Sequence, residues 1–255
     1  GYRGFPASVC TSRNAVVCHG MPRASDLLRD GDIINVDVTT ELDGFHGDTS
    51  ATFCVGAVDD AARRLVERTR AARDAGIAAV RPGARLGDVG AAIVTVAAQA
   101  GLGVVRDYCG HGIGRQMHEA PQVAHVARPG TGLRLRAGMV FTVEPMLTLG
   151  SPEVLLHADG WTVLTADGRW SAQFEHTIAI TEDGRGVIWD LTVLGRIVAE
   201  LDDVVDYIDA CAQRFVMFGI ERVPDERPPI VATMRASSPG SQTTIELSCT
   251  QATTC

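Results

Sequence analysis

A pair of strand-like stretches joined by the dipeptide Asp43-Gly44 is the feature that most constrains how this chain folds. The first stretch, 33–40, is rich in β-branched residues, and the second, 45–55, is also typical of a strand. An Asp-Gly pair between two such stretches is a strong signal for a two-residue hairpin turn, because both residue types tolerate positive φ. The sequence therefore predicts a long antiparallel β-hairpin.

The predicted register places two aspartates on one face of this hairpin. Asp37 faces Ser50 and Thr39 faces Asp48, so the two carboxylates lie diagonally, within roughly 8 Å of each other. Such a pair is tolerated if water surrounds it, if the two groups share a proton, or if a divalent cation lies between them. For an isolated pair, a solvated strand face is the simplest interpretation.

Three further residues of the metal-ligand type occur in unusual surroundings. His111 lies between glycines, and both Glu144 and Glu175 lie in apolar stretches. A carboxylate flanked by large apolar residues is expected to be buried, and it needs a partner that offsets its desolvation. With the two aspartates, these residues make four carboxylates and one imidazole, a set typical of a two-metal site. The glycines around His111 would also suit a phosphate-binding loop, but no Gly-Lys-Ser/Thr sequence follows them.

Helical and strand-like patterns follow the hairpin. Apolar residues recur at helical spacing in two stretches, which Arg81-Pro82-Gly83 separates. Strand-like material then resumes, with Asp167-Gly168 as a second hairpin signal. The predicted helices are 58–80 and 86–100, and the later predicted strands are 139–149, 161–165 and 171–181.

The last quarter of the chain differs in composition. An apolar stripe at helical spacing predicts an amphipathic helix from Leu191 to about Phe215. Beyond Pro224 the sequence turns to Pro, Ser, Thr and Gln, with few large apolar groups to offset the entropy of ordering. We therefore expect one domain over 1–190, a helix and connector over 191–224, and a disordered tail over 225–255.

Charge and composition narrow the classes of partner. The formal net charge of −8 argues against nucleic acid or an anionic membrane as the main partner. Seven cysteines without a C-x-x-C pair fit a reducing cytoplasm better than a disulfide framework. No apolar run approaches the ~20 residues that span a bilayer. These observations predict a cytoplasmic protein without nucleic-acid specificity or a membrane partner.

Seven short motifs occur in order along the first 184 residues: VCHGMP at 17–22, NVDVT at 35–39, HGDTS at 46–50, GHGIG at 110–114, HEAPQ at 118–122, FTVEPM at 141–146 and AQFEHT at 172–177. Together they resemble the type I methionine aminopeptidases. The resemblance implies the α+β pita-bread fold, in which two pseudo-symmetric halves have curved antiparallel sheets covered by helices. The family usually opens with a further helix and strand, so we expect an N-terminal segment to be missing.

The resemblance also implies a site with two divalent ions, which would be Co, Mn, Fe or Zn. Asp48 and Glu175 would bridge both ions, His111 and Glu144 would complete one, and Asp37 would chelate the other. Glu144 would also shuttle a proton from water to the leaving amine.

Two histidines and a side-chain pocket complete the implied site. His118 would donate a hydrogen bond to the scissile peptide, and His19 would contact the substrate. Either histidine, taken alone, could equally be structural. The positions that match the family's small apolar pocket are Tyr2, Phe5, Cys10, Met117 and Trp161, which could also be ordinary packing residues.

The implied activity is removal of the N-terminal methionine from nascent proteins and peptides with a small second residue. The implied partners are such peptides and nascent chains, with the ribosome as a place of association, and the implied state is a monomer. Two alternatives stay open. One is a proline-directed aminopeptidase or dipeptidase of the same fold, and the other is a non-catalytic pita-bread module that binds peptides.

Overall fold

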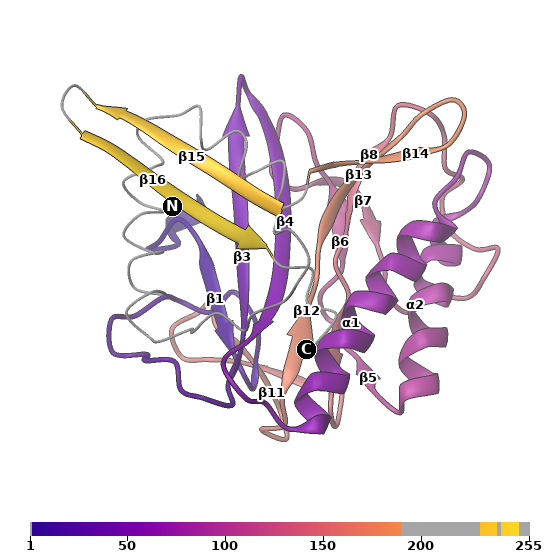
Figure 1. The fold of residues 1–255 in the computed structure, drawn as a ribbon. Coiled ribbons are helices and arrows are strands. Elements are labelled where there is room, and N and C mark those ends of the chain that lie inside the picture. The colour runs from indigo at the N-terminus through magenta and orange to yellow at the C-terminus, as the bar shows by residue number, and fades with distance from the viewer. Residues whose placement is uncertain (1, 190–229, 239–240, 250–255) are drawn as a thin grey trace. The chain divides into compact units, whose positions relative to one another are not determined.

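The computed structural model describes residues 2–189, 230–238 and 241–249, and the chain divides into two compact units, Gly1–Asp190 and Leu191–Cys255. Figure 1 traces the first unit from a short 3-10 turn, η1 (Tyr2–Gly4), through its sheets and two helices. All strand pairs in this unit are antiparallel. The α+β class predicted from the sequence is confirmed.

The hairpin that the sequence predicts is the longest strand pair of the first unit. Strand β3 (Ile33–Leu42) pairs with β4 (Phe45–Cys54). Asp43 and Gly44 form the turn with φ of 52° and 78°, the left-handed values that a two-residue hairpin loop requires. The turn thereby fixes the register of the whole ladder.

The register of this hairpin agrees with the prediction residue by residue. Asp37 pairs with Ser50, and Thr39 pairs with Asp48. Strand β1 (Cys10–Arg13) adds to the other side of β3, with Cys10 opposite Asp37. The two aspartates therefore lie on adjacent strands of a three-stranded sheet.

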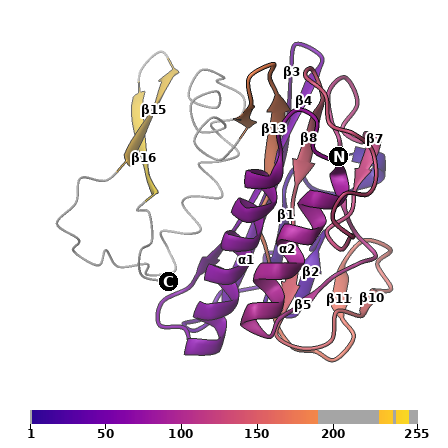
Figure 2. The same ribbon diagram turned by 90° about the vertical axis from the view of Figure 1, so that its right-hand side faces the viewer.

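Two helices follow, close to their predicted bounds. The first, α1 (Asp60–Ala79), begins where Asp59 Oδ1 accepts a hydrogen bond of 2.7 Å from the Ala62 N–H. The second, α2 (Leu86–Ala100), ends at Gly101, which adopts the left-handed conformation. Gly76 lets the helices approach, because a Cβ there would lie 3.0 Å from Ile93. Figure 2 shows the helices side by side against the strands, so they cover one face of the sheets.

The other strands of this unit form three sheets. Their orders are β10-β11-β2, β12-β9-β5 and the five-stranded β14-β13-β8-β6-β7. Their bounds are β2 Val16–Cys18, β5 Gly103–Val104, β6 Gly110–Gly112, β7 Glu119–Val123, β8 Val140–Val143, β9 Met146–Thr148, β10 Val154–Leu156, β11 Val163–Thr165, β12 Ser171–Gln173, β13 His176–Ile180 and β14 Arg185–Trp189.

Two of the predicted long strands are each divided in two. The stretch 139–149 breaks at Glu144-Pro145, where proline offers no N–H to a ladder. The stretch 171–181 breaks at Phe174-Glu175, and its halves join different sheets. Both breaks fall at glutamates that the sequence singles out as metal ligands.

The second hairpin prediction is wrong. Gly168 does lie in a turn, with φ of 71°. The flanking strands do not pair, because β11 pairs with β10 and β2 whereas β12 pairs with β9. An Asp-Gly turn reverses the chain locally, but tertiary packing decides whether the strands that it separates become neighbours.

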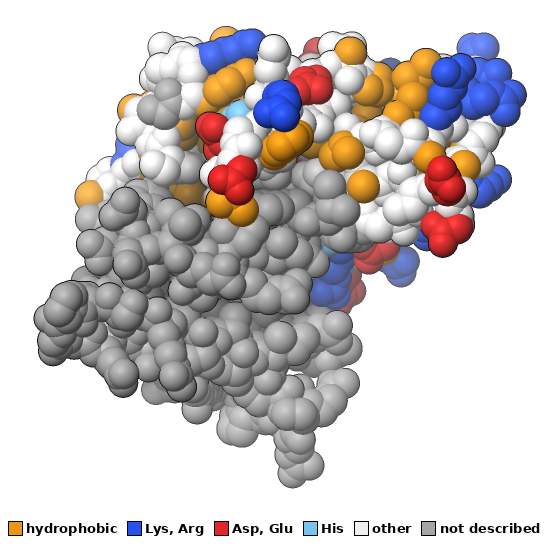
Figure 3. All heavy atoms as spheres, turned by 90° about the horizontal axis from the view of Figure 1, so that it is seen from above, with side chains coloured by type: hydrophobic (Ala, Val, Ile, Leu, Met, Phe, Trp, Pro, Cys, Tyr) orange, Lys and Arg blue, Asp and Glu red, His pale blue; other side chains and the backbone are white. Residues whose placement is uncertain are grey.

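The core of the first unit lies between the helices and the sheets. Phe141 and Ile178 on neighbouring strands are fully buried, as are Leu65 of α1 and Ile93 of α2. On the face shown in Figure 3, several basic side chains lie together at the right-hand edge, and further basic, acidic and hydrophobic side chains are scattered over the described surface. Within the ranges that the structure describes, no helix is long and apolar enough to cross a membrane.

The second unit contains one described hairpin. Strand β15 (Ile230–Ser238) pairs with β16 (Ser241–Cys249) in an antiparallel ladder. The disordered tail that the sequence predicts over 225–255 stays a prediction. The β-branched residues in this stretch, such as Ile230 and Val231, favour a strand. The amphipathic helix predicted from Leu191 lies outside the described residues, and the division of the chain into three segments stays a prediction.

Candidate metal centre

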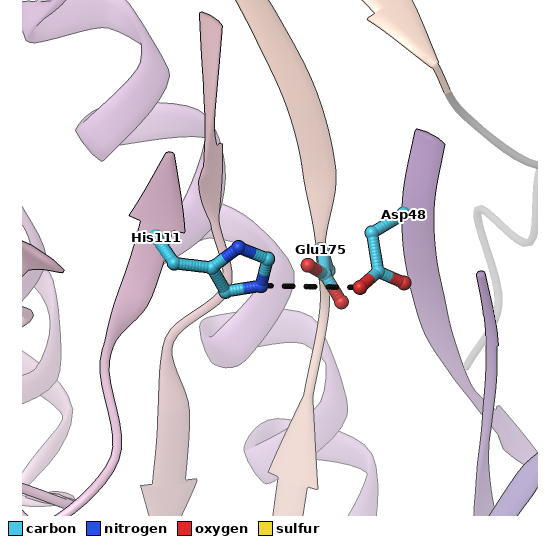
Figure 4. A group of neighbouring side chains, drawn as sticks. All are labelled: Asp48, His111 and Glu175. Atoms are coloured by element: carbon cyan, nitrogen blue, oxygen red, sulfur yellow. Dashed lines mark ion pairs between the residues drawn. The ribbon is translucent and has the colours of Figure 1, made fainter. Parts of the chain in front are cut away.

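Three side chains from distant segments of the chain converge in the first unit. Figure 4 shows Asp48 on β4, His111 on β6 and Glu175 between β12 and β13, with their polar ends turned toward one another. One ligand atom from each lies within 4.8 Å of those of the other two. The three residues expose 6 %, 9 % and 2 % of their surfaces, respectively. This spacing and burial are compatible with a bound cation.

The imidazole of His111 is held in the tautomer of a metal ligand. Its Nδ1 lies 2.9 Å from the Gly112 carbonyl oxygen, which can only accept, so Nδ1 carries the proton. Its Nε2, with a free lone pair, then faces the carboxylates, 3.6 Å from Glu144 Oε1 and 3.9 Å from Asp48 Oδ2. A backbone carbonyl that orients the ring in this way is typical of histidine ligands.

The other two predicted ligands lie beside these three. Asp37 lies close enough to Asp48 for each carboxyl group to change the pKa of the other. Glu144, at the end of β8, has the same relation to Glu175. The structure therefore brings together all five side chains that the sequence singles out, although they are spread over almost 140 positions of the chain.

In the absence of a cation, the ionised form of these carboxyl groups is energetically unfavourable because burial removes water from them. Desolvation raises the pKa of Glu144 to about 8. The pKa values of Asp37 and Glu175 are raised well above the usual range, first by burial and then by neighbouring negative charges, and the pKa of Asp48 is raised by burial. Glu175 Oε1 has no hydrogen-bond partner among the described residues. The site thus fits divalent cations, which would neutralise the carboxylates and occupy their unpaired oxygens.

A layer of polar side chains, not identified from the sequence, holds the carboxylates. Thr39 donates to Asp48 Oδ1 at 2.9 Å. The Thr142 hydroxyl donates to Glu144 Oε1 at 2.6 Å and accepts from the His111 N–H at 3.0 Å. Gln173 Nε2 donates to Glu144 Oε2 at 3.3 Å. Thr142 could have been found from its place two residues before Glu144, which puts both side chains on one strand face.

The two histidines predicted to contact substrate lie at the edge of this cluster. The ring of His118 is centred 4.2 Å from that of His111, and its Nδ1 lies 3.2 Å from the Tyr2 hydroxyl. Although His118 is exposed by area, desolvation, followed by the charge of His111, lowers its pKa to about 4. Burial and the charge of His118 lower the pKa of His19, whose ring lies 5.6 Å from that of Tyr108. The sequence analysis did not single out Tyr108.

The predicted pocket residues lie in several places around these histidines. Phe5 and Trp161 form an edge-to-face pair with ring centroids 5.3 Å apart. Cys10 lies opposite Asp37, and burial and the charges of Asp37 and Asp48 raise the pKa of its thiol. Met117 is half-buried and immediately precedes His118. Tyr2 and Cys10 thus adjoin the carboxylate and histidine cluster, and Phe5 and Trp161 contact each other.

Comparison with known proteins places the chain in a family. Residues 1–182 match the sequence profile of metallopeptidase family M24. The chain belongs to this family. The M24 region is 58 % identical over 184 residues to methionine aminopeptidase B of Synechocystis sp., covering 72 % of this chain and 67 % of that protein. It is 50 % identical over 184 residues to the methionine aminopeptidase of Escherichia coli K12, covering 72 % and 70 %.

Solved structures of M24 relatives agree with the fold. The crystal structure of methionine aminopeptidase from Rickettsia prowazekii matches with a TM-score of 0.72 at 52 % identity, covering 73 % of this chain and 75 % of that one. The enzyme from Thermotoga maritima has the same TM-score and coverage at 43 % identity. A prolidase from Pyrococcus horikoshii matches with a TM-score of 0.54 at 20 % identity, covering 71 % and 46 %, which indicates the shared fold alone. The predicted pita-bread fold is confirmed.

Proposed function

We propose that this M24 chain is a methionine aminopeptidase, which removes the N-terminal methionine from peptides and nascent proteins whose second residue is small. The observation that carries the proposal is the convergence of the Asp48, His111 and Glu175 side chains, with the carboxyl groups of Glu144 and Asp37 beside them. Relatives with 50 % to 58 % identity are methionine aminopeptidases, which supports this specificity over a proline-directed one.

The five residues would hold two divalent ions. Asp48 and Glu175 would bridge them, His111 and Glu144 would complete one, and Asp37 would chelate the other. When bound, such ions lower the pKa of a water molecule and polarise the scissile carbonyl. A carboxylate-rich site with one imidazole accepts Mn, Fe, Co or Zn, so availability in the cell would decide which is used.

The side chains around the ions would carry out the remaining chemistry. Glu144 would take the proton of the attacking water and deliver it to the leaving amine. His118, whose lowered pKa keeps it neutral at pH 7, would donate a hydrogen bond to the scissile peptide through an N–H. The free amine of the substrate would approach the ion that Asp37 would hold, and this would limit the reaction to removal of one residue from the end. His19 would contact the substrate beside the ions.

A side-chain pocket formed by Tyr2, Phe5, Cys10, Met117 and Trp161 would accept the methionine. A small apolar pocket would bind the unbranched thioether side chain of methionine favourably and exclude larger side chains. We further propose that the chain acts as a cytoplasmic monomer on nascent chains, where ribosome association would bring it to its substrates. These proposals about setting rest on the resemblance to the family.

The proposal is tested with a panel of peptides. Metal-stripped protein is supplied with Mn²⁺ and incubated with Met-Ala-Ser, Leu-Ala-Ser, Met-Pro-Ser and Ala-Pro-Ser, and products are followed by mass spectrometry. Release of methionine from Met-Ala-Ser, far faster than any release from Leu-Ala-Ser, is the expected result. Preferential cleavage before proline would instead support the prolidase alternative, and no cleavage by folded, metal-loaded protein would support a binding module.

A further inference from the structure

Asp48 and Glu175 lie on two backbones that meet along a short seam. The seam is centred on Ser50 of β4, since the Glu175 N–H donates to the Ser50 carbonyl at 2.9 Å and the Ser50 N–H donates to the Glu175 carbonyl at 3.3 Å. This is an isolated bridge, because β4 belongs to one sheet and β13 to another. Only one residue pair of the seam is therefore joined directly, backbone to backbone.

Threonine hydroxyls continue the seam two residues to either side of this bridge. On one side, Thr177 Oγ1 accepts from the Asp48 N–H at 3.0 Å and donates to the Asp48 carbonyl at 2.8 Å. On the other side, Thr52 Oγ1 accepts from the Gln173 N–H at 3.1 Å and donates to the Gln173 carbonyl at 2.7 Å. Each hydroxyl thus satisfies both backbone groups of the residue that an antiparallel ladder would place opposite it.

These hydroxyls link the parts of the backbone that carry the candidate ligands. Thr177 holds the backbone of Asp48 itself. Thr52 holds Gln173, which lies two residues before Glu175 and donates to the carboxylate of Glu144. Both threonines are buried, with 1 % and 5 % of their surfaces exposed. A hydroxyl between two backbones acts as a spacer, so the strands stay joined without the spacing of about 4.8 Å that a direct ladder imposes.

We propose that Thr177 and Thr52 are positioning residues that set the separation of the Asp48 and Glu175 carboxylates, and hence the geometry of the candidate two-ion bridge. The inference rests on the proposed function, because the separation of the two carboxylates matters for activity only if they hold metal ions. Both hydroxyls bond to backbone groups. They act through the backbones of Asp48 and Gln173. Loss of the Thr177 hydroxyl removes this partner from both the N–H and the C=O of Asp48. Loss of the Thr52 hydroxyl removes it from the Gln173 N–H, whereas the Gln173 carbonyl still accepts from Asn35 Nδ2 at 2.8 Å.

The test compares Thr177→Val and Thr52→Val with their serine counterparts. Valine keeps the shape and removes the hydroxyl, whereas serine keeps the hydroxyl and removes a methyl group. Thr69→Val is the matched control, because Thr69 is equally buried and donates to the Leu65 carbonyl at 2.7 Å in α1, which carries none of the five candidate ligands. Each full-length variant is stripped of metal, its melting temperature is measured, and Mn²⁺ is titrated by calorimetry.

We expect both valine variants to bind Mn²⁺ about 10- to 100-fold more weakly than the wild type, as outer partners of metal ligands generally do when removed. The serine variants should remain within about threefold of the wild type, since they keep the hydroxyl. Thr69→Val should lower the melting temperature without weakening Mn²⁺ binding. Activity of the seam variants should recover at saturating Mn²⁺, with an unchanged KM for Met-Ala-Ser.

Two results would overturn the inference. Valine variants that bind Mn²⁺ as tightly as Thr69→Val would show that the hydroxyls only stabilise the fold, and serine variants as weak as the valine ones would show that shape matters instead. Because the two threonines lie on opposite sides of the bridge, either one tests the idea if the other does not fold. A wild-type chain that binds no Mn²⁺ would refute the proposed function, and this inference with it.

Discussion

Nε2 of His111 lies 3.6 Å from Oε1 of Glu144, and the other ring nitrogen, Nδ1, donates a hydrogen bond to the Gly112 carbonyl. The imidazole therefore presents a lone pair, not a proton, to a carboxylate that it cannot neutralise. Two acceptors at this distance repel unless a cation or a proton lies between them. This relation is the local reason for treating the cluster as a metal centre.

Loss of a bridging carboxylate should empty the site. Glu175→Gln and Asp48→Asn keep the shape of each side chain but remove its charge, so metal affinity should fall by more than about 100-fold, beyond the effect of losing an outer partner. Bound metal is counted by elemental analysis after dialysis against Mn²⁺. The melting temperature of the metal-free variants is the control, and it should not fall, because the amide that replaces each carboxyl group has the same shape and is neutral at every pH. Full metal content in either variant would contradict the bridging role.

His118→Ala should separate catalysis from metal binding. The ring contacts those of His111 and Tyr2 but is assigned no metal, so Mn²⁺ content should match the wild type. Loss of a hydrogen bond that strengthens in the transition state should lower kcat by about 10²- to 10³-fold. Steady-state kinetics at saturating Mn²⁺ measure this effect. If the site instead loses its metal, the division between ligands and hydrogen-bond donors is wrong.

A buried histidine away from the metal centre predicts how stability depends on pH. His125 exposes 2 % of its surface, and neither ring nitrogen has a hydrogen-bond partner within the part of the chain that the structure describes. Burial lowers its pKa to about 3, against an ordinary value of 6.5. Between these values the unfolded state binds the extra proton, so the free energy of unfolding falls as pH drops from 6.5 toward 3, by at most about 1.4 kcal/mol per pH unit.

His125→Leu should remove this contribution. Urea unfolding of wild type and variant at pH 7, 6, 5 and 4 gives the two slopes, and their difference isolates His125 from the carboxyl groups common to both proteins. The wild type should lose more stability than the variant as the pH falls. Parallel curves would mean that the imidazole gains a proton or a water partner in the folded state.

The start of α1 offers a test of local stability. Asp59 accepts a hydrogen bond from the Ala62 N–H, so Asp59→Ala should lower the free energy of unfolding by about 1 kcal/mol. Asp60→Ala is the matched control, because Asp60 is also acidic and exposed but does not occupy the capping position. Equal effects of the two substitutions in urea unfolding would show that helix-dipole charge, and not the cap, matters.

Much of the site could be predicted because local rules fix it. Asp43-Gly44 sets a register in which Asp37 and Asp48 come close, and the structure has this register. The helices also end near their predicted bounds, since their caps are local signals. The carboxylates flanked by apolar residues, Glu144 and Glu175, are buried as expected from their neighbours.

The remainder depends on contacts between distant segments. Thr177 bonds to Asp48 across 129 residues, and no local pattern shows that its hydroxyl replaces a ladder bond. Strand β6 has only three residues, and two of them are glycines, which have low strand propensity. The sequence therefore gives no local indication of this strand. Tyr108 comes close to His19 only through the fold. The sequence therefore predicts which residues form the site better than it predicts what holds them in place.

The most direct test of the account is a titration of metal-stripped protein with Mn²⁺, in which bound metal and the release of methionine from Met-Ala-Ser are measured together. The account predicts that the wild type binds up to two ions per chain, that methionine release rises with occupancy, and that Glu175→Gln shows neither. Methionine release by fully stripped protein, or metal-loaded and folded protein without any release, would contradict it.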